Sequence, residues 1–472
     1  MTTSSTNARP GRPPVTPGAT PLKAGQVLEV VIEALDDEAC GIATVGGMRL
    51  QVPFAAPGDV VRVAVEAVSR HRPQAVGRCL EVRRSGDARQ AVDCTRSIQG
   101  GGRCGGCPAL HLRDEVALEM KRQGVVQALA AEGLAVSVSI APAPLARGYR
   151  NRATFVAQVS RNGTRYLGGY APRSHRVVRM TGCPVLLSPL PAVCEALEAL
   201  MNRLEMPVHP APLGLRYVLL RANAAGDVLV EGIWRECDEP MLRAFAHEAM
   251  RIPGVAGVWA SENASTGNAI RVSQARHLVG ARHVSHRFGR VDLRLNAGVF
   301  AQLNADVASQ MYVAAAAELG GASQIWDLYC GTGGLALNAL ARHPGAAVLG
   351  VDSVAESVAL ARAAARHQGF SQRARFDVLD LRDAVPDGPM PDAVVVNPPR
   401  RGLDAAVRDV LASDDMTAQT LLYMSCGPKG FARDAARLVS AGWRLEEVRA
   451  WDMLPGTAHV ELLARFTRSR PR

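Results

Sequence analysis

Residues 324–334 read QIWDLYCGTGG, a short apolar run followed directly by a glycine-rich turn. A helical pattern over 304–319 precedes this stretch. Five apolar runs follow it, namely VLGVD (348–352), ARFDVLD (374–380), DAVVVNPP (392–399), LLYMSC (421–426) and ELLARF (461–466). Short buried strands that alternate with helices are typical of a doubly wound sheet. Residues 298–472 are therefore predicted to form a Rossmann-like α/β domain.

The glycine-rich turn predicts a nucleotide pocket. Gly331 and Gly333 lie between a strand and a helix, where glycine lets the backbone approach a ligand and adopt positive φ. Asp352 ends the next strand, where an acid can accept hydrogen bonds from the hydroxyls of an adenosine ribose. No lysine followed by serine or threonine comes after the turn, which argues against a phosphate-binding P-loop. The pattern alone fits a dinucleotide, S-adenosylmethionine or a purely structural turn.

A second motif distinguishes these alternatives. Asn397, Pro398 and Pro399 end the strand DAVVV, and ligands of doubly wound sheets bind at the carboxyl ends of strands. An Asn-Pro-Pro loop at this place is a hallmark of methyltransferases, which indicates S-adenosylmethionine as cofactor. Arg400 follows where amino-group methyltransferases usually carry an aromatic residue. Methylation of an amino group is therefore disfavoured.

Cys426 ends the next strand and is the candidate nucleophile. A lone cysteine is often buried and inert, but a methyltransferase of uracil has a use for a thiolate. Addition of the thiolate to carbon 6 makes carbon 5 nucleophilic enough to attack a sulfonium methyl group. A general base must then remove the proton on carbon 5. Glu461 is the candidate base, and His459 would lie on the same face of an extended strand.

Several of these motifs together resemble the S-adenosylmethionine-dependent RNA uracil-5-methyltransferase family. They are FAQLN (300–304), DLYCGTGGLAL (327–337), VVNPPRRGL (395–403), the SC-x-P loop (425–428) and DML-P-x-TAHVE (452–461), in family order. The resemblance implies that Cys426 is the nucleophile and Glu461 the base. It also implies a cofactor pocket lined by Gln302, Tyr329, Asp352 and Asn397. Asn at position 397 is similar to a ribosomal-RNA branch of the family.

Two positions depart from the family pattern. Gly427 stands where the family usually has Asn, and Gly456 stands where it usually has His. Loss of the Asn side chain removes a hydrogen-bonding group beside the base. These departures put the rate or the target in doubt more than the reaction type.

Residues 24–84 are predicted to be all-β. The runs VLEVVIEAL (27–35), GMRLQVPFA (47–55), DVVRVAVEAV (59–68) and QAVGRCLEVRR (74–84) are separated by Gly, Pro and Asp. They resemble the TRAM RNA-binding barrel. The end of this region carries Arg70, His71, Arg72, Arg78, Arg83 and Arg84, a basic edge that would contact RNA or simply be solvated.

Residues 85–297 are predicted to form a mixed α+β domain with a cysteine-rich loop. Cys94, Cys104 and Cys107 lie close together in the sequence, and Cys183 follows. Spacing alone suits zinc or an iron–sulfur cluster equally. The family resemblance implies a [4Fe–4S] cluster with a structural or RNA-positioning role. The gap between Cys94 and Cys104 is longer than usual in the family, and we expect Gly100, Gly101 and Gly102 to loop out.

Composition limits the setting of the protein. The chain has 472 residues and a net charge of +10, which suits a polyanionic partner. No run of 18 apolar residues predicts a membrane span. Residues 1–23 lack the apolar core of a secretory signal and are predicted to be a disordered basic tail. We therefore expect a cytoplasmic monomer whose clustered cysteines are reduced.

The sequence as a whole predicts an enzyme that methylates carbon 5 of a uridine in RNA. We expect 23S ribosomal RNA as the target, because tRNA enzymes of the family generally lack both the TRAM barrel and the cluster. A tRNA uracil-5-methyltransferase is the alternative enzyme. A third hypothesis is an RNA-binding protein with an inactive methyltransferase domain, against which the intact Cys426, Glu461 and Asn397 argue.

Overall fold

The computed structural model describes residues 22–468 except 173 and 268. The predicted disordered tail, apart from residues 22 and 23, lies outside the described residues. The described residues divide into two compact units, one of residues 22–91 with 111–116 and the other of 92–110 with 117–468. The predicted multidomain α/β fold is confirmed.

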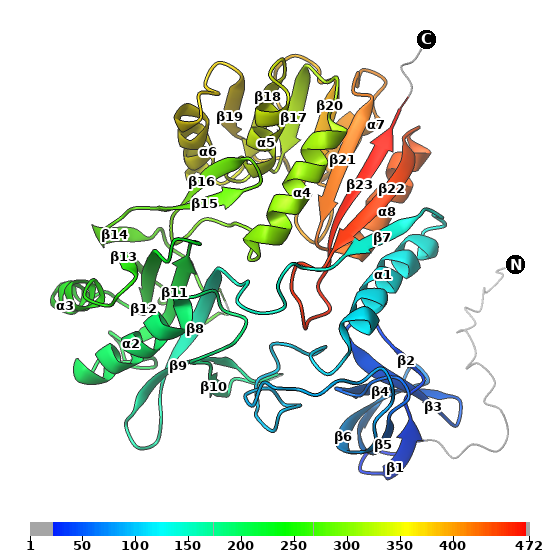
Figure 1. The fold of residues 1–472 in the computed structure, drawn as a ribbon, viewed down its shortest axis with the longest axis vertical. Coiled ribbons are helices and arrows are strands. Elements are labelled where there is room, and N and C mark those ends of the chain that lie inside the picture. The colour runs from blue at the N-terminus through cyan, green and yellow to red at the C-terminus, as the bar shows by residue number, and fades with distance from the viewer. Residues whose placement is uncertain (1–21, 173, 268, 469–472) are drawn as a thin grey trace, which may run out of the picture. The chain divides into compact units, whose positions relative to one another are not determined.

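The first unit is one curled sheet of six strands in the order β1-β5-β6-β4-β3-β2 (Figure 1). The predicted β runs are confirmed, and CGIATV adds a strand that the sequence analysis did not single out. Alternating residues such as Leu50, Val61 and Val63 are buried in its core. The strands are β1 (Val27–Val31), β2 (Ala34–Leu35), β3 (Cys40–Val45), β4 (Met48–Pro53), β5 (Val60–Val68) and β6 (Gln74–Arg84).

The second unit begins with a seven-stranded sheet in the order β10-β9-β8-β11-β12-β13-β14. Helices α2 (Leu190–Arg203) and α3 (Glu239–Ala249) pack on one face of it through an apolar core. A hairpin of β15 (Val284–Phe288) and β16 (Val291–Leu295) follows. The sheet consists of β8 (Arg152–Val159), β9 (Arg165–Tyr170), β10 (Val177–Arg179), β11 (Leu215–Ala222), β12 (Val228–Trp234), β13 (Val255–Glu262) and β14 (Arg276–Gly280).

The rest of the second unit is an eight-stranded sheet in the order β19-β18-β17-β20-β21-β23-β22-β7 (Figure 1). The five strands from β19 to β21 are parallel, and β23 runs antiparallel to both neighbours. The strands are β7 (Val138–Ala141), β17 (Gln324–Leu328), β18 (Ala347–Asp352), β19 (Ala374–Val378), β20 (Ala393–Val396), β21 (Thr420–Ser425), β22 (Arg444–Trp451) and β23 (Glu461–Thr467).

Helices cover both faces of this sheet, as the strand–helix alternation predicts. Side chains of a strand alternate between the faces, so Val395 joins one core and Val394 the other. The first core packs α4 (Ala305–Glu318), α5 (Gly334–Arg342) and α6 (Ala355–His367). The second packs α1 (Asp114–Ala131), α7 (Ala405–Ala412) and α8 (Pro428–Ser440).

The edge strand β7 was not indicated by the sequence. In the chain it precedes the seven-stranded sheet, yet it pairs in parallel with β22 near the C-terminus. Helix α1, just before it in the chain, contributes Val125 and Leu129 to the second core. Among the residues that the structure describes, no helix combines the length and apolar character needed to span a membrane.

Candidate active site

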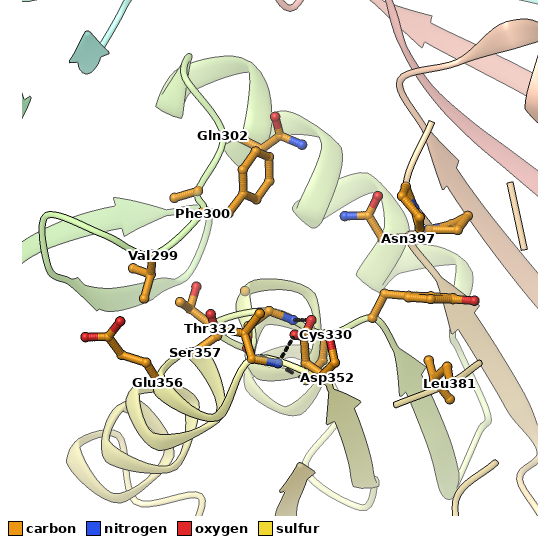
Figure 2. A pocket seen from close by; sticks show the side chains of 18 of the residues that line it. Val299, Phe300, Gln302, Cys330, Thr332, Asp352, Glu356, Ser357, Leu381 and Asn397 are labelled. Carbon is orange, nitrogen blue, oxygen red and sulfur yellow. Dashed lines mark hydrogen bonds between the residues drawn. The ribbon is translucent and has the colours of Figure 1, made fainter. Parts of the chain in front are cut away.

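A cavity of about 830 Å³ lies where the strand order of the eight-stranded sheet reverses, at the carboxyl ends of β17 and β20 (Figure 2). In doubly wound sheets this is where ligands bind. The lining includes seven side chains or backbone groups singled out from the sequence. These are Gln302, Tyr329, Gly331, Asp352, Asn397, Cys426 and Glu461. Residues up to 159 positions apart in sequence thus meet at one edge of the sheet.

The glycine-rich turn between β17 and α5 is held in left-handed backbone conformations. Gly331 has φ +54° and Gly333 has φ +79°, while the non-glycine Tyr329 has φ +64°. Such a conformation in a tyrosine is strained and marks functional sites. Gly333 does not line the cavity. It is the N-cap of α5, where an added Cβ would lie 3.0 Å from the ring of Phe376.

Asp352 links the turn to the next strand. Its two carboxylate oxygens accept hydrogen bonds from the backbone N–H groups of Gly331 and Val354, each at 2.9 Å. Figure 2 shows this carboxylate at the floor of the cavity, beside Thr332 and Cys330. Each oxygen keeps a lone pair for a further donor. The carboxylate can therefore accept ribose hydroxyls while it fixes the turn.

Arg400 is the group near both candidate catalytic residues. Burial raises the pKa of the Cys426 thiol and the nearby Glu461 carboxyl raises it further, while a hydrogen bond and the charge of Arg400 act in the opposite direction. Burial raises the pKa of Glu461 to about 8, and Arg400 opposes that rise. The cation therefore favours the ionised form of both groups. In the sequence, Arg400 argues only against amino-group methylation, and its place beside both acids is visible in the structure alone.

His459 is not among the residues that line this cavity. The residue is exposed overall, and partial burial of its ring together with the charge of Arg400 lowers its pKa. Its backbone N–H donates to Thr457 Oγ1 at 3.2 Å, so it belongs to the loop that precedes β23. The predicted common face of His459 and Glu461 does not bring both to the cavity.

The two departures from the family pattern have local structural correlates. A Cβ at Gly427 would lie 3.0 Å from the carbonyl oxygen of Arg400, so glycine permits a close approach of these two backbones. Gly456 has φ +75°, which a side chain would strain. A Cβ there would also contact Cys107 at 3.5 Å.

Sequence analysis missed other residues of the cavity wall. Arg271, Phe300 and Glu356 line it, and Phe300 is 66% exposed (Figure 2). Glu356 accepts a hydrogen bond from Asn296 at 2.5 Å. Phe300 belongs to the motif FAQLN and could have been noticed there. Arg271 lies in a loop without a motif, so no signal in the sequence identifies it.

The four predicted metal ligands line a second cavity, of about 40 Å³. Cys94, Cys104, Cys107 and Cys183 all border it. Burial and the three neighbouring thiols raise the pKa of Cys107 to about 12. Within the described ranges, no three histidine, cysteine or acidic side chains converge as ligands of one metal ion. The thiols therefore surround a common space without meeting at one point.

The glycine triplet lies in a tight turn between Ser97 and Cys104, whose backbones form a bridge. A Cβ at Gly100 would lie 2.1 Å from the carbonyl oxygen of Cys94, and one at Gly102 would lie 2.1 Å from that of Arg96. The triplet thus folds back onto the chain beside Cys94. The backbone N–H of Cys104 then donates to the Arg96 carbonyl at 2.8 Å, which brings the two cysteine segments together. Gly100 and Gly102 allow this close packing, whereas Gly101 has no atom within 4 Å of an added Cβ.

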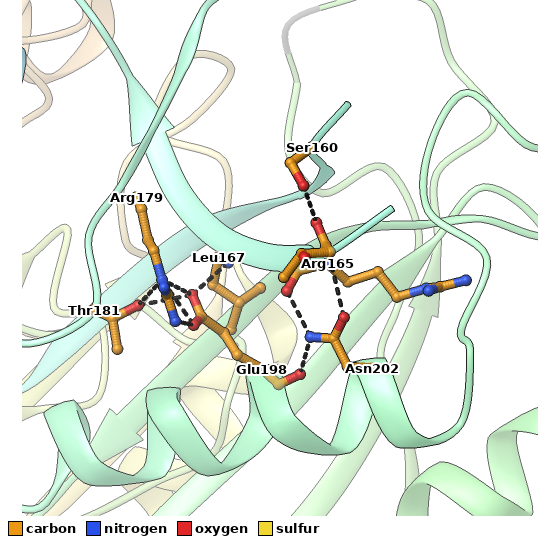
Figure 3. Close-up of polar contacts among 8 residues, drawn as sticks. Ser160, Arg165, Leu167, Arg179, Thr181, Glu198 and Asn202 are labelled. Carbon is orange, nitrogen blue, oxygen red and sulfur yellow. Dashed lines mark hydrogen bonds and ion pairs between the residues drawn. The ribbon is translucent and has the colours of Figure 1, made fainter. Parts of the chain in front are cut away.

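A buried carboxylate fixes the segment that leads to Cys183. Glu198 of α2 accepts hydrogen bonds from Thr181 Oγ1 at 2.7 Å and from the backbone N–H of Leu167 at 2.8 Å (Figure 3). It also pairs with Arg179. The Glu198 side chain is 3% exposed and that of Arg179 62%, so the buried bonds from Thr181 and Leu167 hold this segment more than the ion pair does. The segment just before Cys183 is thereby held against α2 and strand β9 of the seven-stranded sheet.

The predicted basic edge of the first unit is exposed. Arg70, His71 and Arg72 form the tip between β5 and β6 and lie in solvent. Two of the other members are partly neutralised, since Arg78 pairs with Glu66 at 3.1 Å and Arg83 pairs with Glu81 at 3.0 Å. The exposed tip is thus the part of the edge best able to contact phosphates.

Two family models match the chain. A model of the methyltransferase small domain matches residues 290–421. A model of the TRAM domain of tRNA (uracil(54)-C(5))-methyltransferase matches residues 28–72. The second match falls on the six-stranded curled sheet.

Curated relatives match almost the whole length. A 23S rRNA (uracil(1939)-C(5))-methyltransferase of Chromohalobacter salexigens is 32% identical over 93% of this chain and 89% of its own. An uncharacterized RNA methyltransferase of Halalkalibacterium halodurans is 29% identical over 94% of this chain and 97% of its own.

A solved structure matches the fold. It is the Pyrococcus abyssi tRNA (uracil-54, C5)-methyltransferase in complex with S-adenosyl-L-homocysteine, with a TM-score of 0.74 and 26% identity. The match covers 93% of this chain and 100% of that one. A TRAM-like sheet is thus no argument against a tRNA target, contrary to our expectation.

Proposed function

Because the chain belongs to the family of S-adenosylmethionine-dependent RNA uracil-5-methyltransferases, we propose that Cys426 and Glu461 carry out this reaction in the cavity at the strand ends. The observation that carries the proposal is that a half-buried thiol, a buried carboxyl and Arg400 border the same cavity as the glycine-rich turn. The thiolate forms a bond from Cys426 Sγ to carbon 6 of the uracil. The resulting enolate gives carbon 5 the electron pair with which it attacks a methyl group.

S-adenosylmethionine supplies that methyl group and leaves as the neutral thioether. Glu461 then takes the proton from carbon 5. The electrons of the broken carbon–hydrogen bond restore the double bond between carbons 5 and 6, and Cys426 leaves as a thiolate. The target base must leave its stack to reach the cavity, which costs a few kcal/mol.

The cofactor is assigned to the wall formed by the turn and β18. Asp352 would accept hydrogen bonds from the ribose hydroxyls, since it lines the cavity at the strand end and each of its oxygens keeps a free lone pair. Gly331 allows the backbone to approach the cofactor, and Gly333 sets the start of α5. Gln302 and Asn397 approach from two other segments, and Asn397 would bind polar groups beside the transferred methyl.

We assign a uridine of 23S ribosomal RNA as the target. The relative named for that activity is aligned over nearly the full length at 32% identity. A tRNA uridine is the second candidate, favoured by the likeness to the Pyrococcus abyssi enzyme. Methylation assays with 23S rRNA fragments and tRNA transcripts test the choice. Mapping 5-methyluridine in RNA from a strain without the gene identifies the position.

The four cysteines are proposed to hold a [4Fe–4S] cluster. The donor set is all thiol, and a cubane places its own atoms between the ligands, so its thiolates surround a space without converging on one ion. When bound, the cluster supplies a rigid cross-link between the segment 94–107 and Cys183. Its role is structural or in positioning RNA.

RNA that carries 5-fluorouridine at the target tests the mechanism. Fluorine on carbon 5 leaves no proton for Glu461 to remove, so the enzyme stalls after methyl transfer. We expect an adduct that resists denaturation and requires S-adenosylmethionine, and Cys426→Ala should give neither adduct nor product. An adduct or full turnover in Cys426→Ala would refute the nucleophile. Normal turnover by Glu461→Gln would refute only the base.

A further inference from the structure

The loop that joins β22 to β23 ends at Glu461, and its backbone is held in an unusual way. The carbonyls of residues 453, 454, 455 and 456 each accept a hydrogen bond from a different part of the chain. Asn304 Nδ2 donates to Met453 at 3.2 Å, and Lys121 Nζ donates to Leu454 at 3.3 Å. The hydroxyl of Tyr149 donates to Pro455 at 3.2 Å, and the backbone N–H of Ala109 donates to Gly456 at 2.9 Å.

These donors are all remote in sequence from the loop that they hold. Asn304 precedes α4, whose first turn it caps, and Lys121 lies on α1. Tyr149 comes before β8, and Ala109 belongs to the cysteine-rich segment. Their carbonyl acceptors lie in an irregular loop that has no strand partner to satisfy them. The Leu454 carbonyl also accepts a hydrogen bond from Thr457 Oγ1 at 2.7 Å within the loop. Buried backbone groups need partners, so the remote donors take the place of the missing ladder at Met453, Pro455 and Gly456.

The donors are held firmly. The side chain of Lys121 is fully buried and pairs with Asp452, the residue that begins the loop. Asn304 is 1% exposed, and Tyr149 is 5% exposed. A donor that cannot turn to solvent fixes the position of its acceptor. The loop is therefore constrained at four successive carbonyls by rigid neighbours.

We propose that these four donors act as a carbonyl clamp that positions Glu461 for proton removal. Lys121, Tyr149 and Asn304 are then positioning residues, since none of them lines the cavity. Misplacement of a reacting group by about 1 Å can slow a reaction by about a hundredfold, so the clamp acts on the rate. The inference rests on the proposed role of Glu461 as base.

The clamp also connects the cysteine site to the base. Ala109, which lies two residues after Cys107, donates to the Gly456 carbonyl. Pro455 borders the cavity of the four thiols. The conformation of the cysteine-rich segment therefore affects the loop before Glu461 through a direct contact. This contact gives the cysteine site a mechanical route to the reaction that involves no electron transfer.

Tyr149→Phe is the cleanest test, because it removes one hydroxyl and keeps the ring. Single-turnover release of tritium from carbon 5 of the target uridine measures proton removal. We expect release to slow on the order of fivefold, as expected for the loss of one hydrogen bond. The affinity for S-adenosylmethionine should stay unchanged. Adduct formation on 5-fluorouridine RNA, which needs no base, should also keep its wild-type rate.

A double-mutant cycle with Glu461→Gln shows whether Tyr149 acts through the base. The clamp predicts that Tyr149→Phe slows the wild type but adds nothing in the Glu461→Gln background. Equal slowing in both backgrounds, or slower adduct formation, would overturn the clamp. Wild-type release by Glu461→Gln alone would overturn the base itself, which is a different result from a failed cycle.

Two variants complete the design. Asn304→Ser keeps a side chain that can cap α4 but is too short to reach Met453, and it should reproduce the effect of Tyr149→Phe. Tyr166→Phe is the matched control. Its hydroxyl donates to the Val177 carbonyl at 3.5 Å in the seven-stranded sheet. This bond does not touch the loop before Glu461, so its loss should leave tritium release unchanged. Slowing of the same size in Tyr166→Phe would also overturn the clamp.

Discussion

Proton removal should depend on pH through Glu461. The base acts as a carboxylate, and its pKa is raised to about 8 by burial. About a tenth of the carboxyl groups are then ionised at pH 7 and about nine-tenths at pH 9. The rate of tritium release from carbon 5 should therefore rise roughly tenfold between these two values, since a raised pKa moves ionisation to higher pH.

Arg400→Gln changes this profile in a defined direction. The guanidinium opposes the raised pKa values of both Glu461 and Cys426, so its loss should move both ionisations to still higher pH. At pH 7 the variant should release tritium more slowly than the wild type, and at high pH it should recover. Arg433→Gln is the control, because it makes the same change of charge at an exposed position of α8.

The thiol can be followed separately with 5-fluorouridine RNA, because formation of the adduct needs Cys426 and no base. The Glu461 carboxylate raises the pKa of Cys426. Glu461→Gln removes that charge and should shift adduct formation to lower pH, while it slows tritium release. A release rate that is flat from pH 7 to 9, or a profile that Arg400→Gln leaves in place, would refute this electrostatic reasoning.

Three further predictions concern other parts of the protein. Anaerobically purified protein should be brown with about four irons per chain, and Cys104→Ser should lose the colour, whereas stoichiometric zinc without iron would contradict the cluster. Replacing Arg70 and Arg72 together by Gln should weaken RNA binding and reduce its salt slope by about 1.5, with cofactor affinity unchanged. An unaltered slope would count against that tip. Asp352→Ala should weaken S-adenosylmethionine binding by about 10- to 100-fold in calorimetry, the effect of hydrogen bonds to a charged group, and near-normal affinity would contradict its role.

The catalytic half of the fold was predictable because its chemistry follows its topology. Parallel strands end at one edge, so Asp352, Asn397 and Cys426, each at or just after a strand end, had to gather there. The pattern of apolar runs sufficed to place them. That rule does not reach Glu461, which begins an antiparallel strand beside β21 and was predicted from the motif DML-P-x-TAHVE.

Other features depend on contacts that leave no periodic signal. Strand β7 pairs with β22, which lies more than 300 residues later in the chain. A run of four residues is too short to predict a strand or its partner. The role of Arg400 depends on which way its side chain points after the Pro-Pro loop. Gly100 and Gly102 look like flexible loop residues in the sequence, yet they are needed where the chain folds back on Cys94 and Arg96. In each case tertiary packing determines the conformation, and the local sequence does not indicate it.

One cation beside two acids gives the proposed reaction its order. Cys426 and Glu461 disfavour each other's ionised forms, so the thiolate is easiest to form while Glu461 keeps its proton. Once the thiolate has added to the ring, its charge moves into the enolate. Methyl transfer from the positively charged sulfonium then neutralises the negative charge of the enolate, because the methylated adduct and the thioether are both neutral.

At that stage no thiolate opposes ionisation of the carboxyl, and Arg400 favours the carboxylate alone. The base thus becomes available only after the methyl group has arrived. Proton removal then restores the ring and returns the negative charge to sulfur. This requires Arg400 to stay within reach of both groups throughout. A shorter cation that could not reach both, as in Arg400→Lys, should therefore slow the reaction even though the charge is kept.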